Sequence, residues 1–198
     1  MTTASRLTRR ALGGVFASAA TALGLGGSLP VALAAPVPDP VLRDAMLRGL
    51  ALAWVRGDAA QVAAAQAAVD DLAQTDPEGA LLCRLYRVLD IRPAAYWHGQ
   101  DAGQAAPEDM ALLHRAMAAC QPVGFTYTDM QGDVTGRRVL PLALVHPAQG
   151  VKLLAWCLER QDYRQFFVRE MAGLTSLPGD FRADRLALLD GLVAKEGA

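Results

Sequence analysis

The chain has 198 residues, 53% of them hydrophobic and 20% charged, which excludes an intrinsically disordered chain and a small disulfide-rich scaffold. Its net charge is −1, but residues 1–38 hold three arginines and no acid, so the remainder carries −4. Because that remainder lacks the excess of basic residues with which proteins bind phosphate backbones, we expect no strong binding to duplex DNA.

Residues 1–35 have the pattern of a signal peptide of the twin-arginine type. Arg9 and Arg10 precede an apolar stretch, residues 11–29, and the small residues Ala32 and Ala34 follow at the spacing of a cleavage site. We therefore expect export to the periplasm, with cleavage after Ala34. The alternative is a protein anchored in the membrane by an uncleaved signal, because about 20 apolar residues can just span a bilayer.

A small helical region is predicted over residues 39–105. Aspartate followed by proline at positions 39 and 40 is typical of a helix start, and apolar side chains recur afterwards at helical spacing. Helices are predicted over residues 39–56, 59–74 and 79–91. The loop that follows contains Tyr96 and Trp97, which we expect to pack over the core. The second helix has no Lys or Arg, so it does not resemble a DNA-recognition helix.

The second half of the chain changes from helical to alternating periodicity. Pro107 opens a fourth helix, and from Val123 onward Phe125 and Tyr127 share one strand face. Pro141 lies inside the second apolar run, which predicts a bend, a bulge or an edge there. Strands are predicted from 123 to 128, 136 to 146, 151 to 158 and 163 to 171, and a last helix from 180.

Four short motifs follow one another in this half: Val-Gly-Phe-Thr-Tyr at 123–127, Arg-Arg-Val-Leu-Pro-Leu-Ala-Leu-Val at 137–145, Leu-Leu-Ala-Trp-Cys at 153–157 and Asp-Tyr-Arg-Gln-Phe at 162–166. In order and spacing they resemble the WYL domain, the effector-sensing module of many bacterial transcriptional regulators. The resemblance covers about residues 110–185. It departs at 151–153, where Val-Lys-Leu replaces the Trp-Tyr-Leu that names the family, and at 167–171, where Phe-Val-Arg-Glu-Met replaces Arg-Leu-Asp-Arg-Ile.

The resemblance implies a fold. The expected class is α+β: the signal segment, then the helical region, then residues 106–198 as a small, strongly bent barrel of the Sm/SH3 type with flanking helices. It also implies a ligand site, which by position includes Tyr127, Arg137, Arg164 and Phe166.

The residue chemistry of this set points to an anion. Arg164 alternates with Phe166 on one strand, and Lys152 adds a second cation in an otherwise apolar strand. An arginine beside aromatic rings can bind a phosphate or carboxylate bidentately, or stack on a base. We therefore expect a small anionic or nucleotide-like ligand. The alternative for Arg164 is a structural ion pair with Glu170 or Asp162.

No catalytic motif occurs: the sequence lacks a P-loop, Gly-x-Ser-x-Gly and His-Glu-x-x-His. The three cysteines form no Cys-x-x-Cys pair and are expected to be buried thiols. We predict a non-enzymatic, exported, ligand-sensing regulatory module without metal or cofactor. The alternatives are a scaffold protein whose helical region docks a protein partner and whose barrel is structural, and a cytoplasmic transcriptional regulator of this family that lacks its DNA-binding domain.

Overall fold

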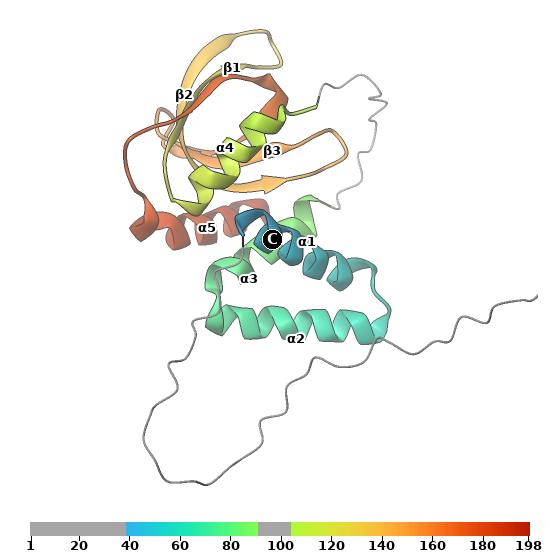
Figure 1. Cartoon of the computed structure of the whole chain (residues 1–198). Helices are drawn as coiled ribbons and strands as arrows, with labels where there is room; N and C mark the ends of the chain where they lie inside the picture. Colours follow the sequence, from blue (N-terminus) through green and yellow to red (C-terminus); the bar gives the residue numbers. More distant parts are fainter. Residues whose placement is uncertain (1–38, 91–103) are drawn as a thin grey trace, which may run out of the picture. The chain divides into compact units, whose positions relative to one another are not determined.

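The computed structural model describes residues 39–90 and 104–198, which belong to one compact unit of helices and antiparallel sheet (Figure 1). The predicted α+β class is confirmed. The predicted signal segment, residues 1–35, and the aromatic pair Tyr96 and Trp97 lie outside the described residues. Within the described part, no helix is long and apolar enough to cross a membrane.

Three helices open the described chain and pack against one another: α1 (Pro40–Arg56), α2 (Ala59–Thr75) and α3 (Pro77–Leu89). Each begins after an aspartate whose side chain accepts hydrogen bonds from N–H groups of the first turn, which otherwise lack partners. These caps are Asp39, Asp58 and Asp76. The three predicted helices are confirmed, with their ends shifted by one or two residues.

Helix α3 joins the helical part to the sheet. Its Leu85 and Tyr86 are almost completely buried, and it contacts α1, α2 and the C-terminal helix α5 (Arg182–Glu196). The same hydrophobic core includes Leu142 and Leu154 from the sheet. Helices and sheet therefore share one core, and the burial of its apolar area stabilises both.

The sheet contains five strands in the order β4-β3-β2-β1-β5, with every neighbouring pair antiparallel. Their bounds are β1 (Val123–Thr128), β2 (Val134–Val145), β3 (Lys152–Cys157), β4 (Asp162–Phe167) and β5 (Met171–Ser176). The two edge strands, β4 and β5, do not pair in the described chain, so the sheet is not closed. The predicted small, strongly bent barrel of the Sm/SH3 type is therefore not confirmed.

The strand predicted from 163 to 171 is wrong beyond Phe167. A short 3₁₀ turn, Val168–Glu170, ends β4, and the chain then crosses from one sheet edge to the other to form β5 against β1. Arg169 fixes this turn: its guanidinium lies 4.2 Å from the centroid of the Phe167 ring and donates to the carbonyl of Gln149.

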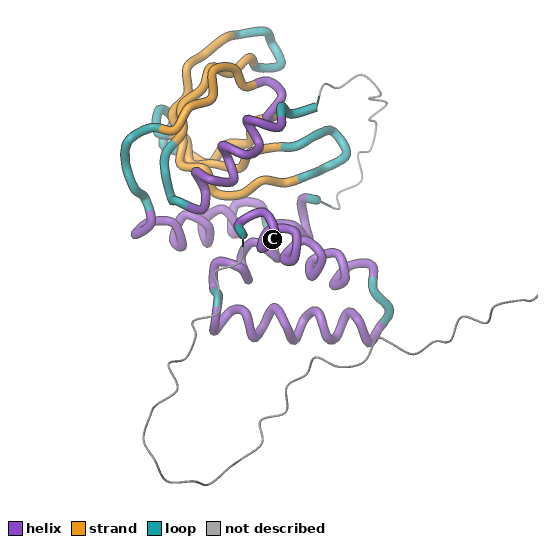
Figure 2. The backbone as a smooth tube through the Cα atoms, in the orientation of Figure 1, coloured by secondary structure: helices purple, strands orange, loops and turns teal. Residues whose placement is uncertain are grey.

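The sheet has two faces with different coverings. The inner face packs against α4 (Pro107–Ala118), whose Leu113 and Ala116 join a second core with residues such as Val139 and Leu153. Figure 2 shows α4 lying across the curled strands. The outer face packs against α3 and α5. Alternation along each strand therefore decides whether a side chain faces α4 or the other helices.

All three cysteines are free and buried, as predicted. Cys83 belongs to the core around α3, Cys120 follows α4, and Cys157 lies on the inner face. Burial is the main cause that raises the pKa of the Cys83 thiol to about 11, so this group is protonated at neutral pH and behaves as a small apolar side chain.

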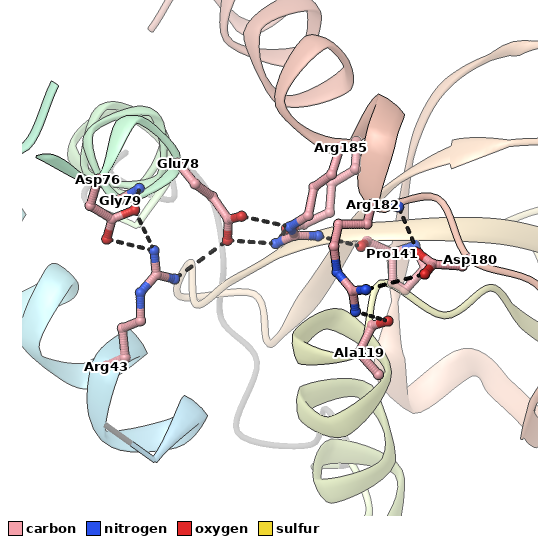
Figure 3. Close-up of polar contacts among 10 residues, drawn as sticks. Arg43, Asp76, Glu78, Gly79, Ala119, Pro141, Asp180, Arg182 and Arg185 are labelled. Carbon is pink, nitrogen blue, oxygen red and sulfur yellow. Dashed lines mark hydrogen bonds and ion pairs between the residues drawn. The ribbon is translucent and has the colours of Figure 1, made fainter. Parts of the chain in front are cut away.

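The far half of β2 has an edge that β1 does not cover, because their pairing ends at Val139. A bulge lies between Pro141 and Ala143, which confirms the irregularity predicted at that proline. Side chains from the helices bind the backbone groups of this edge. Arg185 of α5 donates to the carbonyls of Pro141 and Leu142, each at 3.2 Å (Figure 3 shows the first).

Two more side chains bind backbone groups farther along the chain at this edge. Arg48 of α1 donates to the carbonyl of Leu144, and Asp90, just after α3, accepts from the N–H of His146 at 2.6 Å. Because a buried backbone group without a partner is costly, these side chains substitute for the missing strand and fix the helices to the sheet.

Candidate functional site

The predicted site residues divide between the two faces of the sheet. Tyr127, Arg137, Arg164 and Phe166 lie on the inner face, because their cross-strand partners are inner-face residues such as Phe125. Lys152 pairs with Phe167 and lies on the outer face. The structure therefore brings four of the five predicted residues to one face and separates the fifth from them.

An aromatic cluster occupies the inner face where β1 approaches β4. The rings of Phe125, Tyr127 and Phe166 contact one another edge to face, with centroid distances of 5.0 to 6.3 Å. This geometry places ring edges against ring faces, the arrangement that aromatic quadrupoles favour. Phe125 and Phe166 are almost completely buried, whereas Tyr127 is half-buried. Tyr127 is therefore the member of the cluster within reach of a ligand.

The hydroxyl of Tyr127 is held in place by the turn after β4. Its oxygen accepts the backbone N–H of Phe167 at 3.3 Å. Burial is the main cause that raises the pKa of Tyr127, and the nearby carboxylate of Glu170 acts in the same direction. The phenol consequently keeps its proton at neutral pH and can donate a hydrogen bond.

Arg137 stands next to the cluster. It lies directly across from Phe125 in the β1–β2 ladder and is half-buried. Among the described residues its guanidinium has no hydrogen bond or ion pair. Two residues earlier on the same face, Thr135 pairs with Tyr127, and its hydroxyl oxygen is buried without a partner in the described chain. These two side chains offer hydrogen-bonding groups beside the aromatic rings.

Arg164 lies on β4, two residues before Phe166. Its side chain is 53% exposed, and its one ion pair within residues 39–90 and 104–198 is a long contact of 3.8 Å with the carboxylate of Asp162. Asp162 has a closer partner in Lys195 at 2.7 Å, and that hydrogen bond is the main cause of its lowered pKa. Glu170, the other predicted partner, pairs with Arg169 instead. Arg164 is therefore not one half of a buried ion pair.

Lys152 belongs to a different group of residues. Its Nζ lies 4.8 Å from the centroid of Phe167 and 3.4 Å from the amide oxygen of Gln165, both on the outer face. The Arg169 guanidinium contacts the same ring. Lys152 is therefore on the opposite face of the sheet from the aromatic cluster.

The sequence predictions missed Phe125, Thr135 and Arg169. Alternation with Tyr127 was the signal that could have identified Phe125, because residues two apart on a strand share a face. Arg169 carried no such signal, since its position depends on the 3₁₀ turn that the strand prediction overlooked. Glycine at position 150, with φ of +115°, leaves room for its guanidinium, because a Cβ there would approach the Arg169 Nη1 atom to 2.6 Å.

Residues 108–176 match the family model of the WYL domain, so the resemblance seen in the sequence is confirmed. No curated protein matches the chain. Among solved structures, it is similar to proteasome accessory factor B/C (PafBC) of Arthrobacter aurescens, with 22% sequence identity and a TM-score of 0.39. The similarity covers 74% of this chain and 21% of that one, so the chain spans about a fifth of that protein's length.

Proposed function

Because the chain contains a WYL domain, we propose that it is a regulatory, ligand-sensing protein that binds a small anionic or nucleotide-like ligand on the inner face of the sheet. The residues that contact the ligand are Arg137 and Tyr127, with Arg164 at the β4 side, and the buried Phe166 holds the Tyr127 ring in place by an edge-to-face contact. Lys152, on the outer face, is not part of this site.

The observation that carries the proposal is the combination of an arginine, Arg137, without a partner among the described residues and a half-buried aromatic edge, that of Tyr127. A guanidinium offers a planar set of donors that fits a phosphate or carboxylate, and it keeps its charge at every physiological pH. The half-buried Tyr127 ring beside it can stack on a base, which every nucleobase permits because each has a π-face.

The first test compares two adjacent arginines. Arg137→Ala is expected to weaken binding of inorganic phosphate and of AMP by about tenfold or more, because a charge-assisted hydrogen bond contributes about 1.5–3 kcal/mol. Arg138→Ala is the matched control: Arg138 lies on the opposite face, is 66% exposed and pairs with Glu159. Isothermal titration calorimetry measures both. Equal losses in the two variants would show that only overall charge matters, and the proposed site would be wrong.

Arg164→Ala provides a second expectation. Its removal leaves Asp162 paired with Lys195, so the urea midpoint of unfolding is expected to stay unchanged while anion binding weakens. Arg164→Lys keeps the charge but loses the planar fork and is expected to bind at an intermediate level. A clear loss of stability in Arg164→Ala would contradict the ligand role.

The proposal also includes the compartment in which the protein acts and its lack of catalytic activity. We infer that the protein acts in the periplasm and is not an enzyme; the support is the sequence pattern of residues 1–35 and the lack of catalytic motifs.

Changing Arg9 and Arg10 to lysine is expected to keep the full-length protein in the cytoplasm, because the twin-arginine route requires the pair. Cell fractionation with immunoblotting measures this. Unchanged export of the double variant would contradict the twin-arginine route.

A second candidate function, a scaffold protein, is supported by apolar surface on the helices. A groove of about 430 Å³ between α2, α3 and α5 is lined mainly by apolar residues, including Leu81 and Leu186. Exposed apolar side chains also lie along α1: Val41, Leu42, Met46, Leu52 and Val55. Such surface is typical of sites where a protein partner binds. A ligand-sensing protein would bind its ligand on the inner face of the sheet, whereas a scaffold protein would bind its partner on the apolar surface of the helices.

A further inference from the structure

Helix α1 exposes an apolar surface to solvent. Five of the eight large apolar side chains that are exposed in the described chain belong to it, with exposed fractions of 43 to 63%: Val41, Leu42, Met46, Leu52 and Val55. Helix α2, by contrast, exposes no large apolar side chain along its whole length. Because the solvent-facing side of a helix normally carries polar residues, the exposed side of α1 has the composition of a surface that another molecule covers.

The five side chains form one continuous strip. At about 100° per residue, they fall within one half of the helix circumference. Val41 and Leu42 lie in the first turn of α1 and Val55 in the last, so the strip runs the full length of the helix. Leu47 and Ala51, on the opposite half, are buried in the core with α3. We call the exposed half the α1 strip.

Three charged side chains of α1 are engaged within the fold. Arg43 binds Asp76 at 2.7 Å (Figure 3), and Arg48 binds both Asp44 and Asp90. Their charges are therefore already paired and do not make the strip polar.

One charge of each sign remains at the ends of the strip. Arg56, in the last turn, is exposed and has no hydrogen bond or ion pair among the described residues. At the other end, the Oδ1 atom of Asp39 accepts the N–H groups of Val41 and Leu42, at 2.9 and 3.2 Å. The Oδ2 atom of Asp39 has no such partner in the described chain, and the residue is exposed. The free cation and the free carboxylate oxygen lie about 25 Å apart along the helix axis.

This distribution of charge is complementary to itself. A two-fold axis near the middle of α1 places the Arg56 end of one copy beside the Asp39 end of a second copy, and it does so twice. Such self-complementarity is what a two-fold symmetric interface requires. A parallel arrangement would instead bring the two copies of Arg56 together, and like charges in contact are unfavourable.

The same charges argue against a lipid surface as the cover. Helices that lie on anionic membranes are rich in Lys and Arg beside their apolar face. Next to the α1 strip, Arg56 is the one unpaired cation among the described residues, and exposed aspartates, Asp39 and Asp58, stand at both ends of the helix. An anionic headgroup would be repelled at both ends.

We propose that the α1 strip is the interface of a homodimer, in which α1 packs antiparallel against α1 of a second copy and Arg56 of each copy binds Asp39 of the other. Helix α1 lies outside residues 108–176, so the dimer is formed by the helical region and not by the WYL domain. One helix per copy gives a small interface, of the class below about 1,200 Å² that forms weak, reversible complexes. The dimer is therefore in equilibrium with the monomer.

Sedimentation velocity of the full-length protein between roughly 1 and 100 µM is expected to show a monomer that becomes a dimer as concentration rises. Met46→Asp places a charge near the middle of the α1 strip in both copies and is expected to weaken dimerisation by about tenfold or more. The matched control is Met130→Asp in the turn between β1 and β2, where the methionine is 92% exposed. It is expected to dimerise as wild type does, as is Arg137→Ala.

Two charge-reversed variants test the antiparallel arrangement. Arg56→Glu and Asp39→Lys each place like charges at both ends of the dimer, so each alone is expected to dimerise about tenfold or more weakly than wild type. In an equal mixture, the new glutamate of one variant meets the new lysine of the other, and the native Arg56 meets the native Asp39. The mixture is therefore expected to form heterodimers. Circular dichroism checks that each variant is folded.

Three results would overturn the proposal. The first is a wild-type protein that stays monomeric at every concentration. The second is a Met46→Asp variant that dimerises as wild type does, because a dimer held by another surface, such as the apolar residues 11–29, is insensitive to this change. The third is a mixture of the two charge-reversed variants that associates no better than either variant alone.

Discussion

Arg185→Ala is expected to destabilise the protein by about 3–5 kcal/mol, the usual cost of removing one partner from a buried ion pair. The Arg185 side chain is only 8% exposed, and it joins Glu78 of α3 to two carbonyls on the bulged edge of β2. Its loss removes this donor from two buried carbonyls and leaves Glu78 with only the longer contact to Arg43, at 3.4 Å. Urea unfolding followed by circular dichroism measures the change.

Arg182→Ala is the matched control for this prediction. Arg182 lies three residues earlier on α5, is 68% exposed and pairs with Asp180 at 3.3 Å (Figure 3). Exposed pairs contribute about 0–1 kcal/mol, so the control is expected to lose little stability. Glu78→Ala combined with Arg185→Ala should cost less than the sum of the single variants, because the two side chains interact. Similar losses for Arg182→Ala and Arg185→Ala would contradict a special role of Arg185 at the junction.

Leu113→Ala is expected to cost about 2–5 kcal/mol, because it opens a cavity in the core between α4 and the sheet. Leu113 is fully buried and contacts the inner-face core. Leu186→Ala, on α5, is the control, since that leucine is 47% exposed and is expected to lose about 1 kcal/mol or less. If Leu113→Ala were no more harmful than Leu186→Ala, α4 would not be part of the folded core.

Local patterns were enough to predict most of the elements. The aspartate at position 39 and helical spacing predicted α1, helical spacing predicted α2 and α3, and alternation beginning at Val123 predicted β1. Pro141 predicted the irregularity in β2 because proline cannot donate to a ladder. These features depend on neighbouring residues, so they can be recognised without knowledge of the tertiary structure.

Strand β5 could not be recognised in this way. Buried residues in it stand three apart, Met171 and Leu174, with two exposed residues between them. This spacing departs from the period of two that marks a half-buried strand. Gly173, with φ of +65°, allows the irregular backbone that produces it.

The contacts that fix the helices to the sheet join distant parts of the chain, and so does the strand pairing that places Lys152. The hydrogen bond from Arg48 to Leu144 joins residues 96 apart, and Arg185 and Glu78 are 107 apart. No local pattern indicates which arginine meets which carboxylate. The same holds for Lys152: its strand was predicted, but the face that it occupies depends on the register with β4.

The central claim is that a small anionic or nucleotide-like ligand binds on the inner face of the sheet. Titration of the isotopically labelled protein with AMP, followed by nuclear magnetic resonance, tests it most directly. The account predicts saturable shifts in the ring signals of Tyr127 and Phe166 and in the side chain of Arg137, with the outer face unchanged. It is contradicted if no signal shifts, or if the shifts are confined to the groove that Leu81 and Leu186 line between the helices.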